Sequence, residues 1–480
     1  MSPSHYLMPR PLKLLLTPLS LGLVGVWLFA LVTRFWGLTR FDTLVFDEVY
    51  FARFGRNYLA GVAFFDAHPP LGKYLIALGI YLSGHFDPWG YRWLNAFTGS
   101  LIPLLVAGIA ACLWRKPLFI FLAAFLTSLD GLLLVESRYA LINMYLLFFG
   151  LLGQWLWLLA SEAKKQNRAW YFIGAGLALG CSVAVKWSGL GYVLGLYGVW
   201  GIAKISGWLW GYRQGWGQHL QAWGKWTIWQ MGVILPGVMV AIYSLLWWPH
   251  LRLNPGVGFF QIQQQLYDYH KGISSTAHPY CSAWFTWPLG LRPMSYFYLT
   301  VDKLTPNLDN PPLFGPMSPR NATAWVYDVH AQFNPLLLWL STISVLILLV
   351  GCGAWLWGRW QQNQSHWNLL HVDQWPPHQH LTPAVALFVV INYGANLLPW
   401  VQVGRCLFIY HYLPAAIFSF LGLAALLTQA GSQSDIRWRG VVVLAIALVI
   451  GGFIFWLPIF LGLPLTPLEF SWRMWFRSWI

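Results

Sequence analysis

The sequence predicts an all-α polytopic membrane protein. Of its 480 residues, 58% are hydrophobic and only 9% are charged, whereas about a quarter of the residues in a soluble domain are charged. Mean hydropathy is +0.53, and apolar runs long enough to cross about 30 Å of hydrocarbon recur along the chain. No strand-period alternation is found, and helices satisfy their backbone groups inside lipid. These observations favour a bundle of transmembrane helices.

Twelve apolar runs follow one another. They lie near residues 14–36, 71–84, 92–113, 117–135, 139–160, 170–185, 188–206, 228–248, 335–358, 382–400, 404–428 and 439–461. The run at 71–84 is short and starts after Pro69 and Pro70, so we expect it to be half-inserted, which leaves about 11 crossings. The alternative is that it crosses and one of the runs between 117 and 160 does not.

The charges indicate orientation. A net charge of +14 could attract nucleic acid, but the basic residues are scattered in short clusters beside apolar runs, which is typical of cytoplasmic loops. The clusters are Arg10/Lys13, Arg115/Lys116, Lys164/Lys165/Arg168, Lys204/Arg213/Lys225, Arg359 and Arg437/Arg439. We therefore expect a multi-pass protein of the cell inner (plasma) membrane and no nucleic-acid partner. The N-terminus is expected to be cytoplasmic and the C-terminus external. The first span is expected to remain uncleaved.

Three regions follow from this reading. Residues 1–248 would form an N-terminal transmembrane module whose first external loop is at about 37–70, and residues 335–480 would form the C-terminal helices. Residues 249–334 mix Pro, Gly, Asn, Tyr and Trp, which predicts external irregular backbone with short interfacial helices. The polar linker at 361–380 reads as a cytoplasmic loop, and its His371, His378 and His380 read as solvated side chains rather than metal ligands.

The cysteines predict neither a disulfide framework nor a metal site. The five residues, Cys112, Cys181, Cys281, Cys352 and Cys406, show no CxxC spacing, and four fall within the apolar runs given above.

Acidic residues gather beside the first apolar run. The chain has only 15 Asp and Glu, yet Asp42, Asp47, Glu48 and Asp66 lie within twenty-five residues of one another, with His68 close behind. Charge beside a membrane is costly, so this segment is a candidate for chemistry. A partly desolvated carboxylate can take a proton from a hydroxyl nucleophile. An ordinary exposed loop explains the Asp47–Glu48 pair about as well.

Basic residues of other predicted outward loops complete the candidate site. The set that could meet at the outer rim is Asp47, Glu48, Asp66, His68, Arg92, Glu136, Arg138, Lys186, Arg405 and His411. Arg and Lys bind phosphate, so the mixture favours group transfer from a lipid-linked phosphate. Each residue also has an ordinary explanation: His68 as a turn residue, Glu136 with Arg138 as a structural ion pair, Lys186 and Arg405 as snorkelling side chains.

Seven segments carry a family resemblance. In chain order they are FDEVYF, FFDAHPPLGKYL, YRWLNAFTGSL, LLLVESRYALINMYLLFF, SVAVKWSGL, HPYCSAWFTWPLGLRP and RCLFIYHYLP. From about residue 40 to 415 the chain resembles the dolichyl-phosphate-mannose protein O-mannosyltransferases. The resemblance implies the GT-C glycosyltransferase architecture, a polyprenyl-phosphate-mannose lipid donor, and Ser or Thr acceptors in secreted or membrane proteins on the extracytoplasmic side.

The resemblance also implies roles for residues. Asp47 looks like the family's catalytic base and Glu48 like its essential neighbour, and Arg92 matches an arginine required for activity. Motif positions that would face the donor phosphate are His68, Lys186 and Arg405, the ESR element holds Glu136 and Arg138, and the HPY element holds His278. A β-linked donor and an α-linked product imply inversion, which needs one base and no covalent intermediate.

The chain departs from the family pattern in three ways. Only about eighty residues separate the spans that flank 249–334, so the chain looks like the short bacterial type without a MIR domain. Tyr50 stands where a histidine is usual, and Asn143 replaces a carboxylate. No cofactor is implied; Mg²⁺ could bind the acidic pair, but Arg and Lys supply the same charge neutralisation.

Two other functions stay open. A GT-C transferase could move another lipid-phosphate-linked sugar onto a lipid or glycan acceptor, because some of the motifs are shared across that wider group. A transporter of a lipid-linked anion is less favoured, because it should show charges near the membrane midplane and similar halves, and the sequence shows neither.

Overall fold

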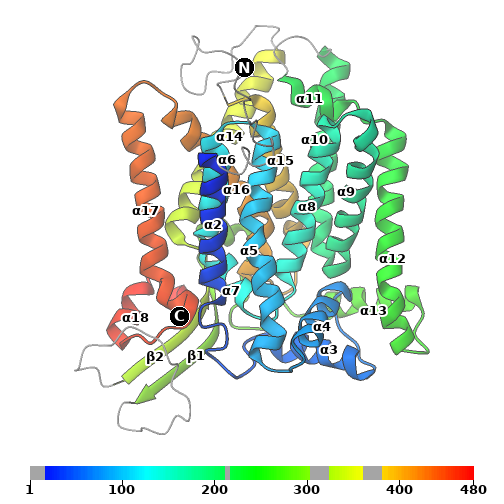
Figure 1. Cartoon of the computed structure of the whole chain (residues 1–480), viewed down its shortest axis with the longest axis vertical. Coiled ribbons are helices and arrows are strands. Elements are labelled where there is room, and N and C mark those ends of the chain that lie inside the picture. The colour runs from blue at the N-terminus through cyan, green and yellow to red at the C-terminus, as the bar shows by residue number, and fades with distance from the viewer. Residues whose placement is uncertain (1–16, 211–216, 303–323, 361–380) are drawn as a thin grey trace, which may run out of the picture.

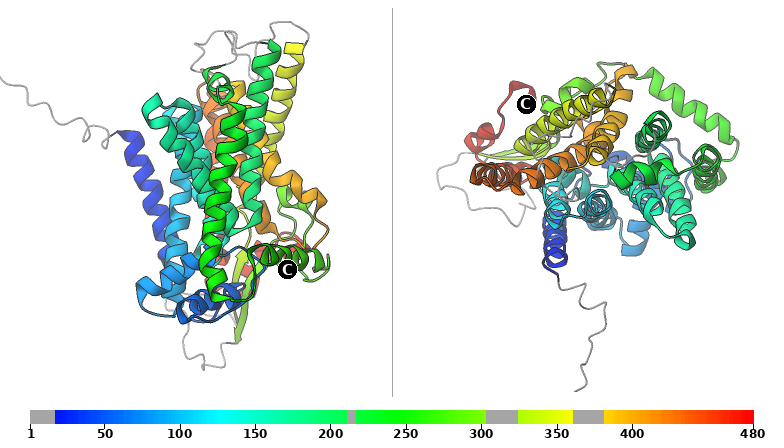
Figure 2. Two further views of the ribbon diagram at one scale, coloured as in Figure 1. Left: turned by 90° about the vertical axis from the view of Figure 1, so that its right-hand side faces the viewer. Right: turned by 90° about the horizontal axis from the view of Figure 1, so that it is seen from above.

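The computed structural model describes residues 17–210, 217–302, 324–360 and 381–480. Most of these residues form long helices that run side by side along the vertical of Figure 1 and are seen nearly end-on from above in Figure 2. The long helices are α2 (Pro18–Phe35), α5 (Pro88–Leu113), α8 (Asn143–Glu162), α9 (Lys165–Val185), α10 (Leu190–Trp210), α12 (Leu235–Leu253, preceded by the π-helical η2, Gln230–Ile234), α14 (Pro335–Trp360), α15 (Pro383–Leu397), α16 (Leu413–Gly431) and α17 (Ile436–Leu461).

The described residues contain nine helical spans that are long and apolar enough to cross a membrane. The pair α6 (Pro117–Ser128) and α7 (Gly131–Arg138), bent by 59°, makes a tenth if it counts as one span. Helix α10 has 21 residues and stands in the same bundle against α9 and α15. With α10 and the bent pair both counted, eleven helical segments of the described residues coincide with the runs that the sequence predicts to cross.

Helix α4 (Leu71–Ser83) is not a crossing. It lies beside α3 (Glu48–Ala60) at the lower end of the bundle in Figure 1. Its 13 residues span about 20 Å at 1.5 Å per residue, which is short of the hydrocarbon thickness. The chain from 36 to 87 therefore stays at one end of the molecule, as expected. We call this the loop-rich end; it also carries α13 (Phe259–Gly272) and α18 (Pro467–Arg473).

Residues 249–334, expected to be irregular backbone with short helices, also contain two strands. Strands β1 (Met294–Asp302) and β2 (Ala324–Ala331) pair antiparallel, from Met294 opposite Ala331 to Asp302 opposite Ala324. They are rich in aromatic and β-branched residues, which suit strands, but β1 has a register irregularity between Ser295 and Phe297 that interrupts its alternation. The expected short helices are present as α13 and the 3-10 helix η3 (Trp284–Leu289).

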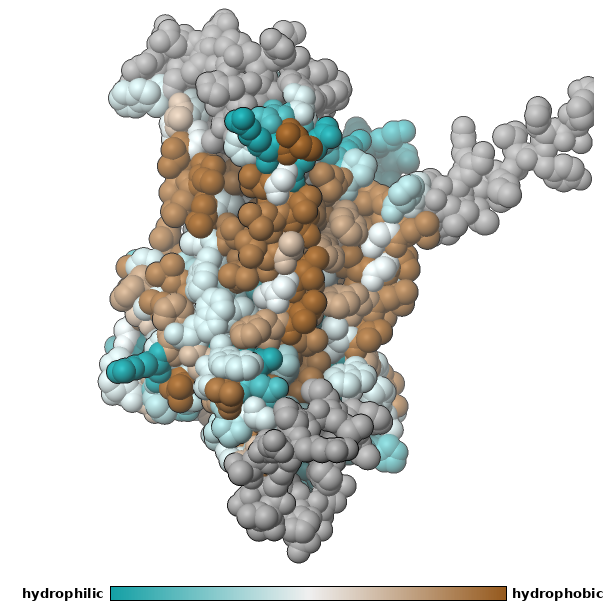
Figure 3. Space-filling model, turned by 90° about the vertical axis from the view of Figure 1, so that its left-hand side faces the viewer, coloured by the Kyte–Doolittle hydropathy of each residue, from teal (hydrophilic) through white to brown (hydrophobic). Residues whose placement is uncertain are grey.

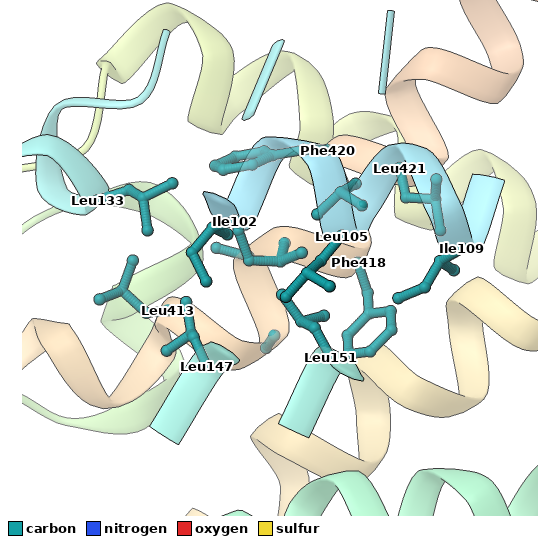
Figure 4. Close-up of a cluster of buried hydrophobic side chains, with 14 of the residues drawn as sticks. Ile102, Leu105, Ile109, Leu133, Leu147, Leu151, Leu413, Phe418, Phe420 and Leu421 are labelled. Carbon is teal, nitrogen blue, oxygen red and sulfur yellow. The ribbon is translucent and has the colours of Figure 1, made fainter. Parts of the chain in front are cut away.

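One apolar core joins the N-terminal and C-terminal helices. Figure 4 shows part of it, where Ile102, Leu105 and Ile109 of α5 gather with Leu147 and Leu151 of α8 and with Phe418, Phe420 and Leu421 of α16. The outer surface in Figure 3 is largely hydrophobic between the two ends of the molecule. A bundle that is apolar both inside and outside has the pattern expected of a protein surrounded by lipid.

Where the helix breaks between α6 and α7, the buried carboxylate of Asp130 accepts hydrogen bonds from backbone N–H groups. Asp130 caps α7 by accepting a hydrogen bond from Leu133 N at 2.7 Å, and its second carboxylate oxygen accepts one from Asn334 N at 3.2 Å. This break turns α7 so that its last residues reach the loop-rich end (Figure 1).

Candidate active site

Asp47 stands at the N-cap of α3, and its side chain does not cap the helix. The preceding residue, Phe46, has φ +54°, a left-handed conformation that is unfavourable for a bulky side chain. The Phe46 ring stacks on Tyr296 of β1, with centroids 4.1 Å apart. Strand β1 therefore supports the backbone turn that positions Asp47.

The surroundings of Asp47 suit a general base. Burial raises the pKa of its carboxyl to about 6; nearby Lys186 opposes this rise and Asp66 adds to it. A base is most effective when its pKa lies near the working pH. At neutral pH Asp47 is therefore ionised and still basic enough to accept a proton from a hydroxyl.

Glu48 and Arg92 hold the loop in place. The guanidinium of Arg92 contacts both carboxylate oxygens of Glu48 and also donates to the carbonyls of Leu38, Phe41 and Thr43. All of these hydrogen bonds of Arg92 go to protein groups. Glu48 also accepts hydrogen bonds from backbone N–H groups, so both residues position Asp47.

Arg138 and Glu136 do not form the ion pair considered from their spacing. Arg138 donates instead to the carbonyls of Thr33, Arg34, Trp36 and Gly37, and so fixes the end of α2. Glu136 accepts hydrogen bonds from the Tyr296 hydroxyl and from Asn143 Nδ2. Buried groups take whichever partners complete their hydrogen bonding, and here those partners come from other elements.

A cavity of about 630 Å³ opens at the loop-rich end. Its walls come from the segment before α4, the start of α10, α13, and the chain from α15 to Arg405. The lining residues are Ala67, His68, Pro69, Lys186, Trp187, Ser188, Leu190, Gly191, Tyr267, His270, Lys271, Ile273, Ala395, Asn396, Pro399, Trp400, Gln402, Val403, Gly404 and Arg405. Among these residues Lys186, Lys271 and Arg405 are cationic and none carries a carboxylate, so the cavity favours an anion.

The pKa values of the titratable lining residues determine which of them carry the positive charge that favours an anion. Burial and the neighbouring Arg405 lower the pKa of Lys186 to about 8, and the same two causes lower that of His270 to about 4. Burial and nearby Lys186 bring the pKa of His68 well below its ordinary value. Near pH 7 the histidines are neutral, and the lysine and arginine side chains carry the positive charge.

Asp66 stands beside the cavity but is paired. Its carboxylate forms a salt bridge with Lys73 of α4 and accepts a hydrogen bond from His68 N at 3.3 Å. Lys73 also donates to the carbonyl of His68 at 2.6 Å. These contacts fix the segment that carries His68, and Asp66 itself is not one of the lining residues of the cavity.

The structure contains a disulfide that the cysteine spacing does not predict. Cys281 and Cys406 are disulfide-bonded, with Cα atoms 5.1 Å apart. The bond joins the chain before η3 to the segment that carries Arg405, and Ser282 N donates to the Leu407 carbonyl at 2.8 Å across the same junction. Because 125 residues separate the two cysteines and Cys406 was placed in an apolar run, spacing gave no sign of the pair.

His278 and His411 support the same junction rather than line the cavity. The His278 ring contacts Phe408, with centroids 5.5 Å apart. His411 is buried, accepts a hydrogen bond from Phe408 N at 3.1 Å and packs edge-on against Trp400. Both histidines therefore hold the chain on either side of the disulfide, close to Arg405.

Several residues of the site were missed by the sequence reading. They are Trp187, His270 and Lys271 on the cavity wall, and Tyr296 and Tyr410 beside Asp47. Within the described part of the chain, no group of three or more His, Cys, Asp or Glu side chains could hold a metal ion. The histidines of the 361–380 linker lie outside the described residues.

Comparison with known proteins is consistent with this geometry. Residues 24–89 and 84–253 match the profile of dolichyl-phosphate-mannose-protein mannosyltransferase, and residues 257–479 match that of the C-terminal four-transmembrane region of protein O-mannosyltransferase. Polyprenol-phosphate-mannose–protein mannosyltransferase of Mycolicibacterium smegmatis is 25% identical over 94% of this chain and 91% of its own. The protein of that name from Mycobacterium tuberculosis is 24% identical, over 95% and 90%.

Solved structures share the fold. The S. cerevisiae protein O-mannosyltransferase Pmt1–Pmt2 complex bound to the sugar donor matches with a TM-score of 0.75 at 15% identity, over 96% of this chain and 92% of that chain. ArnT from Cupriavidus metallidurans bound to undecaprenyl phosphate matches with a TM-score of 0.54 at 17% identity, over 91% and 64%. The chain belongs to the dolichyl-phosphate-mannose protein mannosyltransferase family and has the GT-C glycosyltransferase fold.

Proposed function

We propose that this protein transfers mannose from a polyprenyl-phosphate-mannose donor to Ser or Thr hydroxyls of secreted or membrane proteins. The observation that carries the proposal is the position of Asp47: its carboxylate stands at the N-cap of α3 without capping the helix, it is desolvated, and its charge interacts with that of the cavity residue Lys186. The names of the relatives, which specify a polyprenol-phosphate-mannose donor and protein acceptors, support the same reaction.

Lys186 and Arg405 would bind the donor phosphate. A guanidinium offers a two-pronged contact to phosphate and an ammonium offers a compact charge. Apolar side chains line the same cavity, among them the exposed Leu190 of α10, Ile273 and Val403. This pairing of charge with adjacent apolar surface suits a phosphate that is carried on a prenyl chain.

The proposed reaction is a single displacement. Asp47 takes the proton of the acceptor hydroxyl, the oxygen forms a bond to C1 of mannose, and the bond from C1 to the phosphate oxygen breaks with its electron pair going to phosphate. The products are the inverted mannoside and polyprenyl phosphate, whose added negative charge Lys186 and Arg405 stabilise. The mechanism needs no metal, and activity that persists in EDTA would support this.

We place the site on the extracytoplasmic face of the cell membrane. The Cys281–Cys406 disulfide lies at the loop-rich end, and disulfides persist in oxidising compartments. The basic clusters that include Arg115, Lys164 and Arg437 lie at the opposite end, which suits a cytoplasmic face.

The test uses the full chain in lipid vesicles with a labelled polyprenyl-phosphate-mannose and a threonine peptide. Asp47→Asn should lower transfer by about 10²- to 10⁴-fold, the contribution of a positioned base. Asp42→Asn, at an exposed position of the same loop, is the matched control and should retain parental activity. Parental transfer by Asp47→Asn would refute the base assignment, and label entering lipid or glycan instead of peptide would refute the acceptor class.

A further inference from the structure

Six side chains from six separate segments form a closed ring of contacts next to Asp47. In order around the ring they are Phe46, Tyr296, Glu136, Asn143, Lys186 and Tyr410. The aromatic half begins with the stacked rings of Phe46 and Tyr296, whose planes are 13° apart. Tyr410 contacts Phe46 at 6.2 Å between centroids, and Lys186 Nζ lies 5.0 Å from the centre of the Tyr410 ring. These contacts connect Phe46, the residue before the proposed base, to Lys186, a proposed phosphate ligand.

Hydrogen bonds close the other half of the ring. The Tyr296 hydroxyl donates to one carboxylate oxygen of Glu136, and Asn143 Nδ2 donates to the other at 3.0 Å. Lys186 Nζ donates to Asn143 Oδ1 at 3.4 Å. Glu136 is fully buried and Tyr296 is 6% exposed. Because a buried carboxylate is costly unless its hydrogen bonds are made, these partners determine where Glu136 sits.

The backbone conformation of Phe46 depends on this ring of six contacting residues. Its positive φ is unfavourable for a phenylalanine and persists only where surrounding contacts enforce it. The stacked Tyr296 ring is the closest of its ring contacts. If that contact were lost, the backbone at Phe46 could relax and turn Asp47 away from its present direction.

We propose that Tyr296 is a positioning residue that couples the base to the phosphate site: it holds Asp47 through Phe46, and Lys186 through Glu136 and Asn143. Tyr296 does not line the cavity, so it acts through its neighbours. The inference rests on the proposed function, since it assigns the base to Asp47 and the phosphate contact to Lys186. One side chain would then set the separation between the attacking hydroxyl and the leaving phosphate.

Two substitutions at Tyr296 separate its two contacts. Tyr296→Leu removes both the stack and the hydroxyl, and should lower kcat about a hundredfold, the cost of misplacing a catalytic group by about 1 Å. Tyr296→Phe keeps the stack, so kcat should be close to parental. The loosened link to Lys186 should raise KM for the donor about tenfold, the effect of losing a hydrogen bond to a charged group.

Tyr298→Leu is the matched control. Tyr298 lies on the same strand, is 57% exposed and contacts Phe470 of α18 rather than the ring. It should show parental kcat and KM. All variants are compared as purified full-length protein in vesicles, with polyprenyl-phosphate-mannose as donor and a threonine peptide as acceptor.

The pH profile distinguishes positioning from a purely structural role. In Tyr296→Leu, water reaches Asp47 and relieves the burial that raises its pKa, so the acid limb of kcat/KM should move below the parental position near pH 6. The other groups that act on Asp47 are present in both the parental protein and this variant; they are Lys186, Asp66, Glu136 and Tyr410. A purely structural tyrosine would change the yield of folded protein and leave the acid limb where it is.

A double-mutant cycle keeps the test decisive if Tyr296→Leu does not fold. Tyr296→Phe and Asn143→Ala interrupt the same chain of hydrogen bonds, so the double variant should raise donor KM no more than the worse single variant. Additive effects, or a folded Tyr296→Leu with parental kcat and acid limb, would overturn the inference. A parental protein that transfers no mannose would instead contradict the proposed function, and the two failures are therefore distinguishable.

Discussion

Arg92 grips Glu48 through two parallel contacts, Nε to Oε1 and Nη2 to Oε2, each 2.8 Å long. Both side chains are fully buried. A fork-to-fork pair of this kind fixes orientation as well as distance. Since Glu48 follows Asp47 directly, the pair anchors the base to α5 across 44 residues of sequence.

Arg92→Met should destabilise the fold. Removing one partner of a buried ion pair leaves an uncompensated charge and costs about 3–5 kcal/mol. Thermal unfolding in detergent would measure the loss. The control is Arg115→Met, which breaks the pair with Glu162, where the arginine side chain is 81% exposed; such pairs contribute about 0–1 kcal/mol. Equal unfolding temperatures for Arg92→Met and parental protein would contradict the anchoring role.

The pH dependence of kcat/KM should be bell-shaped. Activity requires ionised Asp47, so it should fall as pH drops through about 6, where the raised pKa of that carboxyl lies. Activity also requires charged Lys186, whose lowered pKa is about 8, so it should fall again as pH rises through that value. Initial rates at low donor concentration from pH 4.5 to 9.5 would measure both limbs. An acid limb near pH 4 would mean that Asp47 is not desolvated.

Lys186→Met and Arg405→Gln should weaken donor binding. Each substitution removes a charged hydrogen-bond donor from the cavity wall, so KM for the donor should rise about ten- to hundredfold. Binding of polyprenyl phosphate, measured by competition, should weaken in parallel. Lys165→Met, exposed near the start of α9, is the control for a general loss of positive charge. Unchanged donor KM in both cavity variants would place the phosphate elsewhere.

Breaking the Cys281–Cys406 bond should impair the site without dismantling the bundle. The disulfide ties down the segment that carries Arg405, so Cys406→Ala or reduction should raise donor KM while helix content stays constant by circular dichroism. Cys181→Ala, at a free cysteine, is the control. In parental protein, thiol labelling after denaturation should find Cys112, Cys181 and Cys352 reactive; labelling of all five would refute the bond.

The sequence predicted the bundle well because long apolar helices are marked by composition alone. The length of the run at 71–84 and its start after Pro69 and Pro70 predict that it does not cross fully, and α4 has only 13 residues. The acidic segment stood out because carboxylates are rare in this chain. These features are local in sequence, and local signals are the ones that periodicity and composition can detect.

The remaining features depend on contacts between distant residues. Nothing near Arg92 shows that its guanidinium binds Glu48, or that Arg138 binds the end of α2 rather than Glu136. Strand β1 was hidden because aromatic residues are frequent everywhere in this chain, and Tyr296 was one tyrosine among 22. Hence the candidate residues could be named, but which of them meet substrate and which hold their neighbours could not.

The ring beside Asp47 also has a consequence for biosynthesis. In chain order its first member is Phe46 and its last is Tyr410. More than four-fifths of the chain must therefore be synthesised before this ring of contacts can form. Nascent chains that have inserted only their early helices are therefore expected to be inert. Mannosyl transfer activity would then indicate that the C-terminal helices have been inserted correctly into the membrane.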